Sequence, residues 1–354
     1  KSIQLLSLKK NNFGKEILVN NEEARDLHKQ SLVIDGHNDS IVAMIRSGNR
    51  NIDGTLKPNW HEHEGAVAYL RQYYADPEQK LLQLDLRKMK KGELDAAFFA
   101  VDCTRSWSNH LLYGLDAIGY FMNEVKSNND SIKIAHNASE LIAAKDSGAV
   151  SALLAIENSD AFERSPYILP LMYKLGVRSV TLTHSTRSHA ADGCEVLNGG
   201  GLTYYGHQLI EQMNDLGIIV DISHTNEASF WDTLEKSQNP VVGTHNCCRT
   251  LCDHPRNLSD KQLRGIADNG GIVGITFVPS FVSSDIANID GLLDHIEHAV
   301  RVAGIDHVGL GSDFDGGGDL ITDVSKLPEI TVGLAARGFD EKELKKVLGL
   351  NWLR

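Results

Sequence analysis

The chain has 354 residues, of which 42% are hydrophobic and 23% are charged, and its 35 basic and 47 acidic side chains give a net charge of −12 with neutral histidines. This composition describes a globular protein that buries a sizeable core. The acidic balance argues against a nucleic-acid partner, because phosphate binding needs clusters of Lys and Arg. No apolar run is long enough to cross a bilayer, so we expect no transmembrane segment.

The first residue and the cysteines bear on the compartment and on thiol chemistry. The chain opens with Lys1 rather than Met, so we favour export after removal of a signal over a cytoplasmic location. Five cysteines are too few for a disulfide scaffold. Cys247, Cys248 and Cys252 are close enough in sequence to bind a metal through thiolates, although no Cys-x-x-Cys pair accompanies them.

Eight short apolar runs, each bounded by turn residues, indicate strands that are buried on both faces of a parallel sheet. These predicted strands are Leu32–Gly36, Ala96–Asp102, Ala152–Glu157, Ser179–His184, Ile218–Ser223, Val241–His245, Gly271–Phe277 and His307–Ser312. Helical periodicity between them predicts helices at Tyr204–Leu216, Glu227–Ser237, Asp260–Asp268 and Ile289–Val302. Eight alternating strand and helix units predict an α/β fold, a TIM (β/α)8 barrel.

Two long segments interrupt this rhythm, residues 40–94 after the first strand and residues 104–150 after the second. The second should contain helices at Asp116–Lys126 and Ala138–Lys145. Insertions after strands border the active-site mouth of such a barrel. Residues 1–30 are expected to form a small hairpin or helix on the barrel's flank. Because no linker-like stretch divides the chain, we predict one domain over residues 1–354.

The ends of the predicted strands are polar. Active-site residues of a TIM barrel lie at the carboxyl ends of the strands. Here the apolar runs stop at Asp35-Gly36-His37-Asn38-Asp39, Glu157-Asn158, Thr183-His184, Ser223-His224, Thr244-His245 and Ser312-Asp313-Phe314-Asp315. Four histidines and several carboxylates are therefore expected to meet at one mouth of the barrel.

His37 and Asp39 supply an imidazole nitrogen and a carboxylate oxygen two residues apart. This spacing suits one divalent metal ion at an extended strand end. A single histidine at a strand end is equally well explained by a structural hydrogen bond. Structural hydrogen bonds do not explain why histidines recur at the same end of four different strands. The whole pattern therefore predicts a metal site.

With these residues in place, the chain resembles the membrane dipeptidase family (renal dipeptidase, peptidase family M19), zinc enzymes whose barrel is of the amidohydrolase, metal-dependent hydrolase type. The matching stretches follow the family's order over about 280 residues: Val33-Ile34-Asp35-Gly36-His37-Asn38-Asp39, Glu157, Leu182-Thr183-His184, Val220-Asp221-Ile222-Ser223-His224, His245, His254-Pro255-Arg256-Asn257-Leu258 and Gly309-Leu310-Gly311-Ser312-Asp313-Phe314-Asp315-Gly316. Most other amidohydrolase barrels carry His-x-His where this sequence has His-x-Asp.

The resemblance implies a pair of zinc ions as cofactors. His37 and Asp39 would bind one ion, His224 and His245 would bind the other, and Glu157 would bridge both. Two cations can lower the pKa of a shared water to near neutrality. A carbamylated lysine is the alternative bridge, but no lysine stands at a matching strand end. Mn or Co could replace Zn in such a site, and the resemblance also favours a homodimer.

The resemblance further implies roles for three residues that act on the substrate. His184 matches the family histidine that points at the substrate carbonyl oxygen, with a further metal ligand as the alternative. Asp313 matches the carboxylate that passes a proton from water to the leaving amine. Asp315 is the alternative proton shuttle, and we expect it instead to cap the Gly-rich turn. Arg256 would pair with the free carboxylate of a dipeptide, unless it is a surface arginine.

Several other polar residues remain outside this scheme. His61-Glu62-His63-Glu64 resembles a metal-binding string, but it falls in the first insertion and is expected to be a surface loop, with a place beside the substrate pocket as the alternative. His295 and His298 lie three residues apart on a predicted helix and are expected on its surface.

The segment after the fourth strand departs from the mammalian pattern of the family. Cys194 stands further after His184 than the cysteine that forms a disulfide with the equivalent of Cys103 in mammalian enzymes, so a Cys103–Cys194 bond is doubtful. Arg187 follows the same strand closely enough to border the site, and its location alone makes it a candidate for contact with substrate. His189 is similarly placed, and no role is predicted for it or for Cys194.

We therefore interpret the chain as a binuclear zinc dipeptidase that hydrolyses dipeptides with a free C-terminal carboxylate. The alternative among enzymes is a metal-dependent hydrolase of another C–N bond, such as a cyclic amide, a β-lactam or an N-acyl amino acid. The alternative outside enzymes is a binding protein on the same barrel, and the complete set of expected ligands together with Asp313 argues against it.

Overall fold

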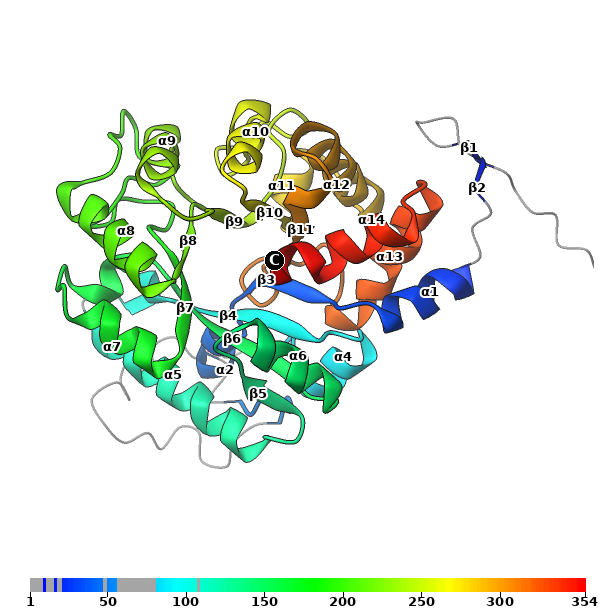
Figure 1. Cartoon of the computed structure of the whole chain (residues 1–354), viewed down its shortest axis with the longest axis horizontal. Helices are drawn as coiled ribbons and strands as arrows, with labels where there is room; N and C mark the ends of the chain where they lie inside the picture. Colours follow the sequence, from blue (N-terminus) through cyan, green and yellow to red (C-terminus); the bar gives the residue numbers. More distant parts are fainter. Residues whose placement is uncertain (1–8, 11–15, 18–20, 47–49, 56–80, 107–108) are drawn as a thin grey trace, which may run out of the picture.

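The computed structural model describes residues 9–10, 16–17, 21–46, 50–55, 81–106 and 109–354. At its centre lies a closed barrel of parallel strands surrounded by helices, the TIM barrel predicted from the sequence (Figure 1). Neighbouring strands follow the order β4-β3-β11-β10-β9-β8-β7-β6, and β4 also pairs with β6, which closes the ring. The barrel strands are β3 (Ile34–Asn38), β4 (Ala96–Asp102), β6 (Val150–Glu157), β7 (Val177–Thr181), β8 (Ile219–Asp221), β9 (Val242–Asn246), β10 (Ile272–Ile275) and β11 (Val308–Leu310).

Helices form the layer outside the barrel (Figure 1). They are α2 (Ser40–Arg46), α4 (Leu86–Lys91), α5 (His110–Ser127), α6 (Ala138–Asp146), α7 (Ile168–Leu175), α8 (Tyr204–Leu216), α9 (Glu227–Lys236), α10 (Asp260–Asp268), α11 (Pro279–Val282), α12 (Ile289–Ala303), α13 (Leu327–Ala336), α14 (Glu341–Lys345) and α15 (Asn351–Leu353). The bounds of α8 and α10 equal the predicted ones.

Capping residues explain why these two helices were predictable. Thr203 starts α8 by accepting a hydrogen bond from the backbone N–H of Gly206, and Gly217 ends it in a left-handed conformation with φ 72°. Ser259 and Gln262 form a capping box at the start of α10. Such side chains satisfy the N–H groups that have no partner inside the helix, so the local sequence determines where the helix begins.

The two insertions differ from expectation in detail. The insertion after β4 contains helices α5 and α6, as predicted, and also a short strand, β5 (Ile132–Ile134), which runs parallel to the start of β6. A three-residue strand with an exposed Lys133 has no apolar run, so its sequence does not predict it. The insertion after β3 reaches the barrel mouth at Gln83 and Leu84, whose N–H groups donate to Asp315.

A bulge in β3 lets the side chain of His37 face the inside of the barrel. Ile34 lines an apolar pocket at the amino end of the barrel, whereas His37 belongs to the polar cluster at the carboxyl end. In a regular strand, residues three apart face opposite sides. However, β3 advances three residues from Asp35 to Asn38 while the paired β4 advances two. The extra residue reverses the alternation, so His37 can face the same side as Ile34.

Strand β9 contains a similar bulge. Val242 lines the apolar pocket, and His245, three residues further on, lies in the polar cluster. Between two matched pairs β9 contains one residue more than its neighbour β10. By contrast, β6 pairs with β4 without any shift, and its Leu153 and Glu157 are four residues apart, as regular alternation requires. Register irregularities therefore decide which residues reach the site.

The last residues of the chain pack against the amino end of the barrel. Trp352 donates from Nε1 to the carbonyl oxygen of Leu310 at 3.0 Å, and its ring centroid lies 5.5 Å from that of Phe98. A Cβ atom at Gly36 or Gly309 would lie 2.4 Å from the indole. Glycine at these strand positions therefore lets the indole approach the backbone of β3 and β11. The apolar pocket beside it has a volume of about 500 Å³.

The described part of residues 1–30 contains both a strand pair and a helix. β1 (Lys9–Lys10) pairs antiparallel with β2 (Glu16–Ile17), and α1 (Asn21–Gln30) packs against α13. His28 anchors α1, because its Nδ1 lies 2.6 Å from Thr331 Oγ1 and its Nε2 lies 3.0 Å from the carbonyl oxygen of Gly92. In the described ranges, none of the helices has the length and apolar character needed to span a membrane.

Candidate metal centre and active site

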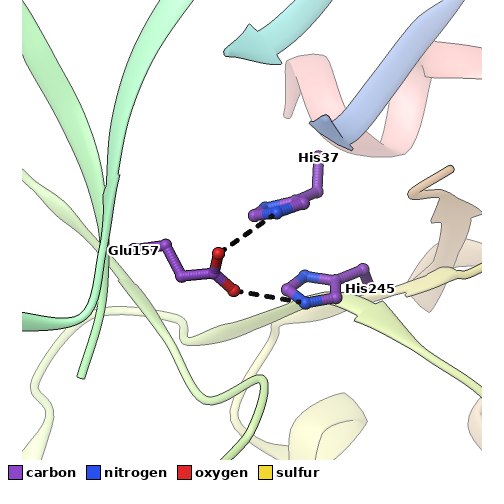
Figure 2. Close-up of side chains that lie close together, drawn as sticks. All are labelled: His37, Glu157 and His245. Atoms are coloured by element: carbon purple, nitrogen blue, oxygen red, sulfur yellow. Dashed lines mark ion pairs between the residues drawn. The ribbon is translucent and has the colours of Figure 1, made fainter. Parts of the chain in front are cut away.

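Glu157, the last residue of β6, faces two imidazole rings that come from other strands (Figure 2). Its Oε2 atom is 3.9 Å from Nε2 of His37 on β3, and its Oε1 atom is 3.6 Å from Nε2 of His245 on β9. The same Oε1 atom lies 3.0 Å from Nε2 of His224, which follows β8. All four side chains are buried. The two carboxylate oxygens thus face different sets of imidazole nitrogens.

Asp39 and Asp313 extend the cluster beside His37. The Nε2 atom of His37 is 3.7 Å from Oδ2 of Asp39, and the possible ligand atoms of His37, Asp39 and Asp313 all lie within 4.8 Å of one another. The backbone N–H of Asp313 donates to the carbonyl oxygen of His37 at 3.0 Å. A Cβ atom at Gly316 would lie 2.1 Å from Asp39 Oδ2 and 2.3 Å from Asp313 Oδ1, so glycine leaves the space that both carboxylates occupy.

His184 borders the other side of the cluster. Its ring centroid is 4.0 Å from that of His224, and the possible ligand atoms of Glu157, His184 and His224 lie within 4.8 Å of one another. His224 adopts a left-handed backbone conformation with φ 69°, which is uncommon for a residue other than glycine. The position of the His184 ring beside His224 and Glu157 suits both roles considered for it, a substrate contact and a further ligand.

Two buried carboxylates near the cluster, Asp35 and Asp221, have no predicted role. Asp35 accepts hydrogen bonds of 2.7 Å from both the backbone N–H and the hydroxyl of Ser312, which holds the end of β11. Asp221 accepts from the hydroxyls of Thr181 at 2.7 Å and Thr244 at 2.6 Å. The sequence does carry a signal for both, because an acidic residue inside an apolar strand needs buried hydrogen-bond partners.

The carboxylates of the cluster raise one another's pKa. Burial, followed by the negative charge of Asp39, raises the pKa of Glu157 well above its usual range and the pKa of Asp313 to about 7. Burial opposes the charged form of His37, but the carboxylates of Glu157, Asp39 and Asp313 outweigh it and raise the pKa of His37 to about 10. The cluster thus favours a positive charge at its centre.

His224 and His245 are affected in the opposite direction. Burial lowers the pKa of both imidazoles well below the ordinary value, and the positive charges of Arg256 beside His224 and of His37 beside His245 add to this effect. These surroundings favour the neutral form of both side chains. A neutral imidazole is the form of histidine that binds a metal ion.

Arg256 lies close to this second pair of histidines. It is only 4% exposed, so the alternative of a surface arginine is wrong. Its Nη2 donates to the carbonyl oxygen of His245 at 3.1 Å, and its Nη1 lies 3.5 Å from Oδ1 of Asn246. Within the described residues Nε has no hydrogen-bond partner. A buried guanidinium with a donor to spare is suited to an anionic group of a ligand.

The expectation that Asp315 caps the Gly-rich turn is wrong. Its carboxylate accepts hydrogen bonds from the hydroxyl of Ser40 at 2.5 Å and from the N–H groups of Gln83 at 2.7 Å and Leu84 at 3.3 Å. The N–H groups of the turn donate to the carbonyl oxygen of Asp313 instead. Asp315 therefore connects the insertion after β3 to the barrel mouth.

The prediction that His295 and His298 lie on a helix surface is also wrong. They are 1% and 5% exposed. His295 Nδ1 accepts from the N–H of Cys248 and its Nε2 donates to the carbonyl oxygen of Val282, both at 3.0 Å. His298 Nε2 lies 2.7 Å from Oδ1 of Asp260. The reason is that α12 packs against α10 and the loop after β9, which cover this face of the helix.

Among the described residues the five cysteines form no disulfide, and the three considered for metal binding contact backbone carbonyls. All five are thiols, in line with the doubt about a Cys103–Cys194 bond. Cys247, Cys248 and Cys252 each donate to a different backbone carbonyl, and none of them joins a group of possible metal ligands in the part of the chain that the structure describes.

The remaining candidates make local contacts or cannot be placed. Arg187 pairs with Asp192 at 2.5 Å, and its side chain is 65% exposed. His189 Nδ1 lies 3.0 Å from Oδ1 of Asp160. These contacts stabilise the loop after β7. The string His61-Glu62-His63-Glu64 lies outside the described residues.

Comparisons with known proteins identify the family of the chain. Residues 21–354 match the family described as membrane dipeptidase (peptidase family M19). An uncharacterised dipeptidase of Schizosaccharomyces pombe is 34% identical over 296 residues, which cover 76% of this chain and 70% of that protein. Dipeptidase verJ of Clonostachys rogersoniana is 30% identical over 292 residues, which cover 78% and 75%.

Solved structures show the same relationship. A metallopeptidase from Rhodobacter sphaeroides, liganded with a phosphinate mimic of the dipeptide L-Ala-D-Ala, has a TM-score of 0.78 and 27% identity, with 91% of this chain and 97% of that chain covered. The family match spans nearly all of the described barrel. The chain therefore belongs to the membrane dipeptidase family, peptidase family M19, and is a dipeptidase of the metallopeptidase type.

Proposed function

We propose that the chain is a binuclear zinc dipeptidase that cleaves dipeptides with a free C-terminal carboxylate. The observation that carries this proposal is the position of Glu157. Its Oε2 atom faces His37, and its Oε1 atom faces His224 and His245. A carboxylate whose two oxygens face different imidazole nitrogens is suited to bridge two cations.

The residues present fit two divalent ions. His37, Asp39 and Glu157 would hold one ion, and Glu157, His224 and His245 would hold the other. The Nε2 atom of His37 is buried and has no hydrogen-bond partner within the described residues. Mixed nitrogen and oxygen donors suit zinc, and they also admit Mn and Co. When bound, the ions would lower the pKa of water and polarise the peptide carbonyl.

We infer that Asp313 transfers the proton. Burial and the charge of Asp39 raise the pKa of its carboxyl to about 7. A carboxyl whose pKa lies near the working pH can both accept and donate a proton. Asp313 would take a proton from the attacking water and give it to the leaving amine. The water oxygen adds to the carbonyl carbon, the C–N bond breaks, and two free amino acids result.

Two further side chains would bind the dipeptide. His184, beside His224, would donate a hydrogen bond to the carbonyl oxygen as negative charge develops there. Arg256 would pair with the free C-terminal carboxylate through its planar guanidinium. This contact supports cleavage of the bond next to a free C-terminal carboxylate, as in a dipeptide, because the internal bonds of a longer peptide lie further from that carboxylate.

The relative from Rhodobacter sphaeroides suggests which substrates to include. That protein is liganded with a mimic of L-Ala-D-Ala. We propose L,D-dipeptides as substrates of this chain beside L,L-dipeptides. The family resemblance also supports a homodimer, which sedimentation velocity can test.

The experiment that tests the proposal measures amino-acid release from L,L- and L,D-dipeptides, a dipeptide amide and a tripeptide. Metal-free protein should cleave none of them, and two zinc ions per chain should restore cleavage of the free dipeptides only. Equal cleavage of the amide would contradict the role of the carboxylate, and full activity with one ion would contradict the binuclear site. No cleavage of any peptide by protein that holds two ions would favour a hydrolase of another C–N bond.

A further inference from the structure

Asp221 is a buried carboxylate that the proposed mechanism does not use. It is 0% exposed at the end of β8. Its Oδ2 atom accepts from the hydroxyls of Thr181 at 2.7 Å and Thr244 at 2.6 Å. Its Oδ1 atom accepts from the N–H groups of Ser223 at 2.9 Å and Thr244 at 3.0 Å. Four donors converge on this group, as expected for an ionised carboxylate that only accepts hydrogen bonds.

Thr244 connects Asp221 to His245. A threonine hydroxyl has one proton to donate and two lone pairs that accept. The proton of Thr244 goes to Asp221, and its Oγ1 atom also lies 2.8 Å from Nδ1 of His245. With its only proton committed to Asp221, the hydroxyl must accept from His245. The Nδ1 atom of His245 therefore carries the proton of the neutral ring.

Ser223 completes this network. Its hydroxyl oxygen accepts from the N–H of His245 at 3.2 Å and from Nδ2 of Asn246 at 2.9 Å. Its own proton is then available to the second lone pair of Thr244, whose Oγ1 lies 3.3 Å away. Because every donor has one acceptor, reversing the bond between Thr244 and His245 would leave Asp221 short of a donor.

We propose that Asp221 is a positioning residue that acts through Thr244 to hold His245 in the Nδ1–H tautomer, with the Nε2 lone pair presented to a cation. This inference rests on the proposed function, in which His245 is a metal ligand. A carboxylate that orients a ligating histidine typically strengthens metal binding. His224 differs, because its Nδ1 atom lies 3.2 Å from the hydroxyl of Ser185 and no described carboxylate accepts from that hydroxyl.

The first test compares zinc affinity by chelator competition on the full chain. In Asp221→Asn the side-chain amide can donate to Thr244, whose proton then turns to His245 Nδ1 and leaves the ring proton on Nε2. We expect the affinity for one of the two zinc ions to fall about 10- to 100-fold. Thr244→Val should have the same effect, and Thr244→Ser, which keeps the hydroxyl, should retain the affinity of the unmodified chain.

Thr181→Val is the matched control. It removes one hydrogen bond to the same oxygen of Asp221 without touching His245. Zinc affinity should stay within about twofold, although the melting temperature falls as it does in Thr244→Val. Equal affinity losses in Thr181→Val and Thr244→Val would show that only the packing of the strand ends matters, and would overturn the proposal.

The second test determines the tautomer directly by long-range ¹H–¹⁵N spectra of the histidine-labelled, metal-free full chain. His245, assigned by its absence in His245→Gln, should show the Nδ1–H form in the unmodified chain and in Thr181→Val. An Nε2–H form in the unmodified chain would overturn the proposal even if Asp221→Asn does not fold. Failure of the unmodified chain to bind a second zinc ion would instead overturn the proposed function, and the tautomer result would still stand.

Discussion

The two ends of the barrel are built from the same strands but from opposite kinds of side chain. At the carboxyl end, β6 contributes Glu157 to a cluster of buried charges. At the amino end, the same strand contributes Leu153 to an apolar pocket that Trp352 also lines. Buried charges that repel one another lower stability, whereas apolar burial increases it. We therefore expect changes at the carboxyl end to affect mainly catalysis and changes at the amino end to affect mainly stability.

The largest effect is expected at Glu157. Glu157→Gln keeps the shape of the side chain but removes the charge that would bridge two ions, so kcat/KM should fall by about 10³-fold or more, corresponding to several kcal/mol. The metal-free variant should be at least as stable as the unmodified chain, because one of several repelling carboxylates is gone. Steady-state kinetics, zinc content and thermal unfolding measure these quantities. A variant that keeps two zinc ions and full activity would remove Glu157 from the site.

Asp313 and Asp315 form a matched pair two residues apart. Asp313→Asn should lower kcat by about 10²- to 10⁴-fold, because the group that transfers the proton is lost. Asp315→Asn should retain most of the activity and lower the melting temperature, because its carboxylate binds Gln83 and Leu84 rather than substrate. Kinetics on purified, zinc-loaded variants decide between them. The reverse pattern would make Asp315 the proton shuttle.

At the amino end we expect the opposite effect. Trp352→Ala should lower the free energy of unfolding by about 3 kcal/mol, since it leaves a cavity against Phe98 and the strand glycines. The kcat/KM of the folded protein should stay within about twofold. Urea unfolding and kinetics at low temperature measure the two quantities separately. A large loss of kcat/KM without loss of stability would show that the two ends are coupled.

Arg256 should influence binding more than chemistry. Arg256→Ala should raise KM for free dipeptides about 10- to 100-fold, the range expected from loss of a hydrogen bond to a charged group. The kcat/KM for a dipeptide amide, which has no carboxylate to pair with, should change much less. An equal loss for both substrates would point to a structural role beside His245.

The smallest effect is expected in the helix layer, away from both ends. Burial lowers the pKa of His295, which is neutral when its Nδ1 accepts from Cys248 N and its Nε2 donates to Val282 O. As pH falls below about 6.5 the unfolded chain binds a proton at this position before the folded chain does. Stability should therefore decrease with falling pH by at most about 1.4 kcal/mol per pH unit for this one group.

Urea unfolding of the metal-free chain between pH 7.5 and 5.5 measures this decrease. His295→Gln removes the titrating group and should flatten the slope, whatever its effect on stability at pH 7.5. Burial lowers the pKa of His28 as well, so His28→Gln should flatten the dependence of stability on pH in the same direction. An unchanged slope in His295→Gln would assign the acid sensitivity to other groups.

Fold and site were predictable from the sequence to different degrees. Strand β4 has the predicted bounds because all of its residues are apolar or lie at its polar end. Strand β3 starts two residues later than predicted, because Leu32 and Val33 are apolar core residues that precede its first paired residue. Burial of His295 was not predictable, because helical periodicity does not reveal which neighbour covers a helix face.

The sequence by itself determined the barrel, the family and the convergence of His37, Glu157, His224 and His245, because apolar runs specify buried strands and all parallel strands end at the same mouth. Only the tertiary structure decided how these residues meet. The bulges that turn His37 and His245 inward, and the hydrogen bonds that join Asp221 to Thr181 and Thr244, depend on the register between neighbouring strands. Register is a relation between segments far apart in the chain, and no local pattern encodes it.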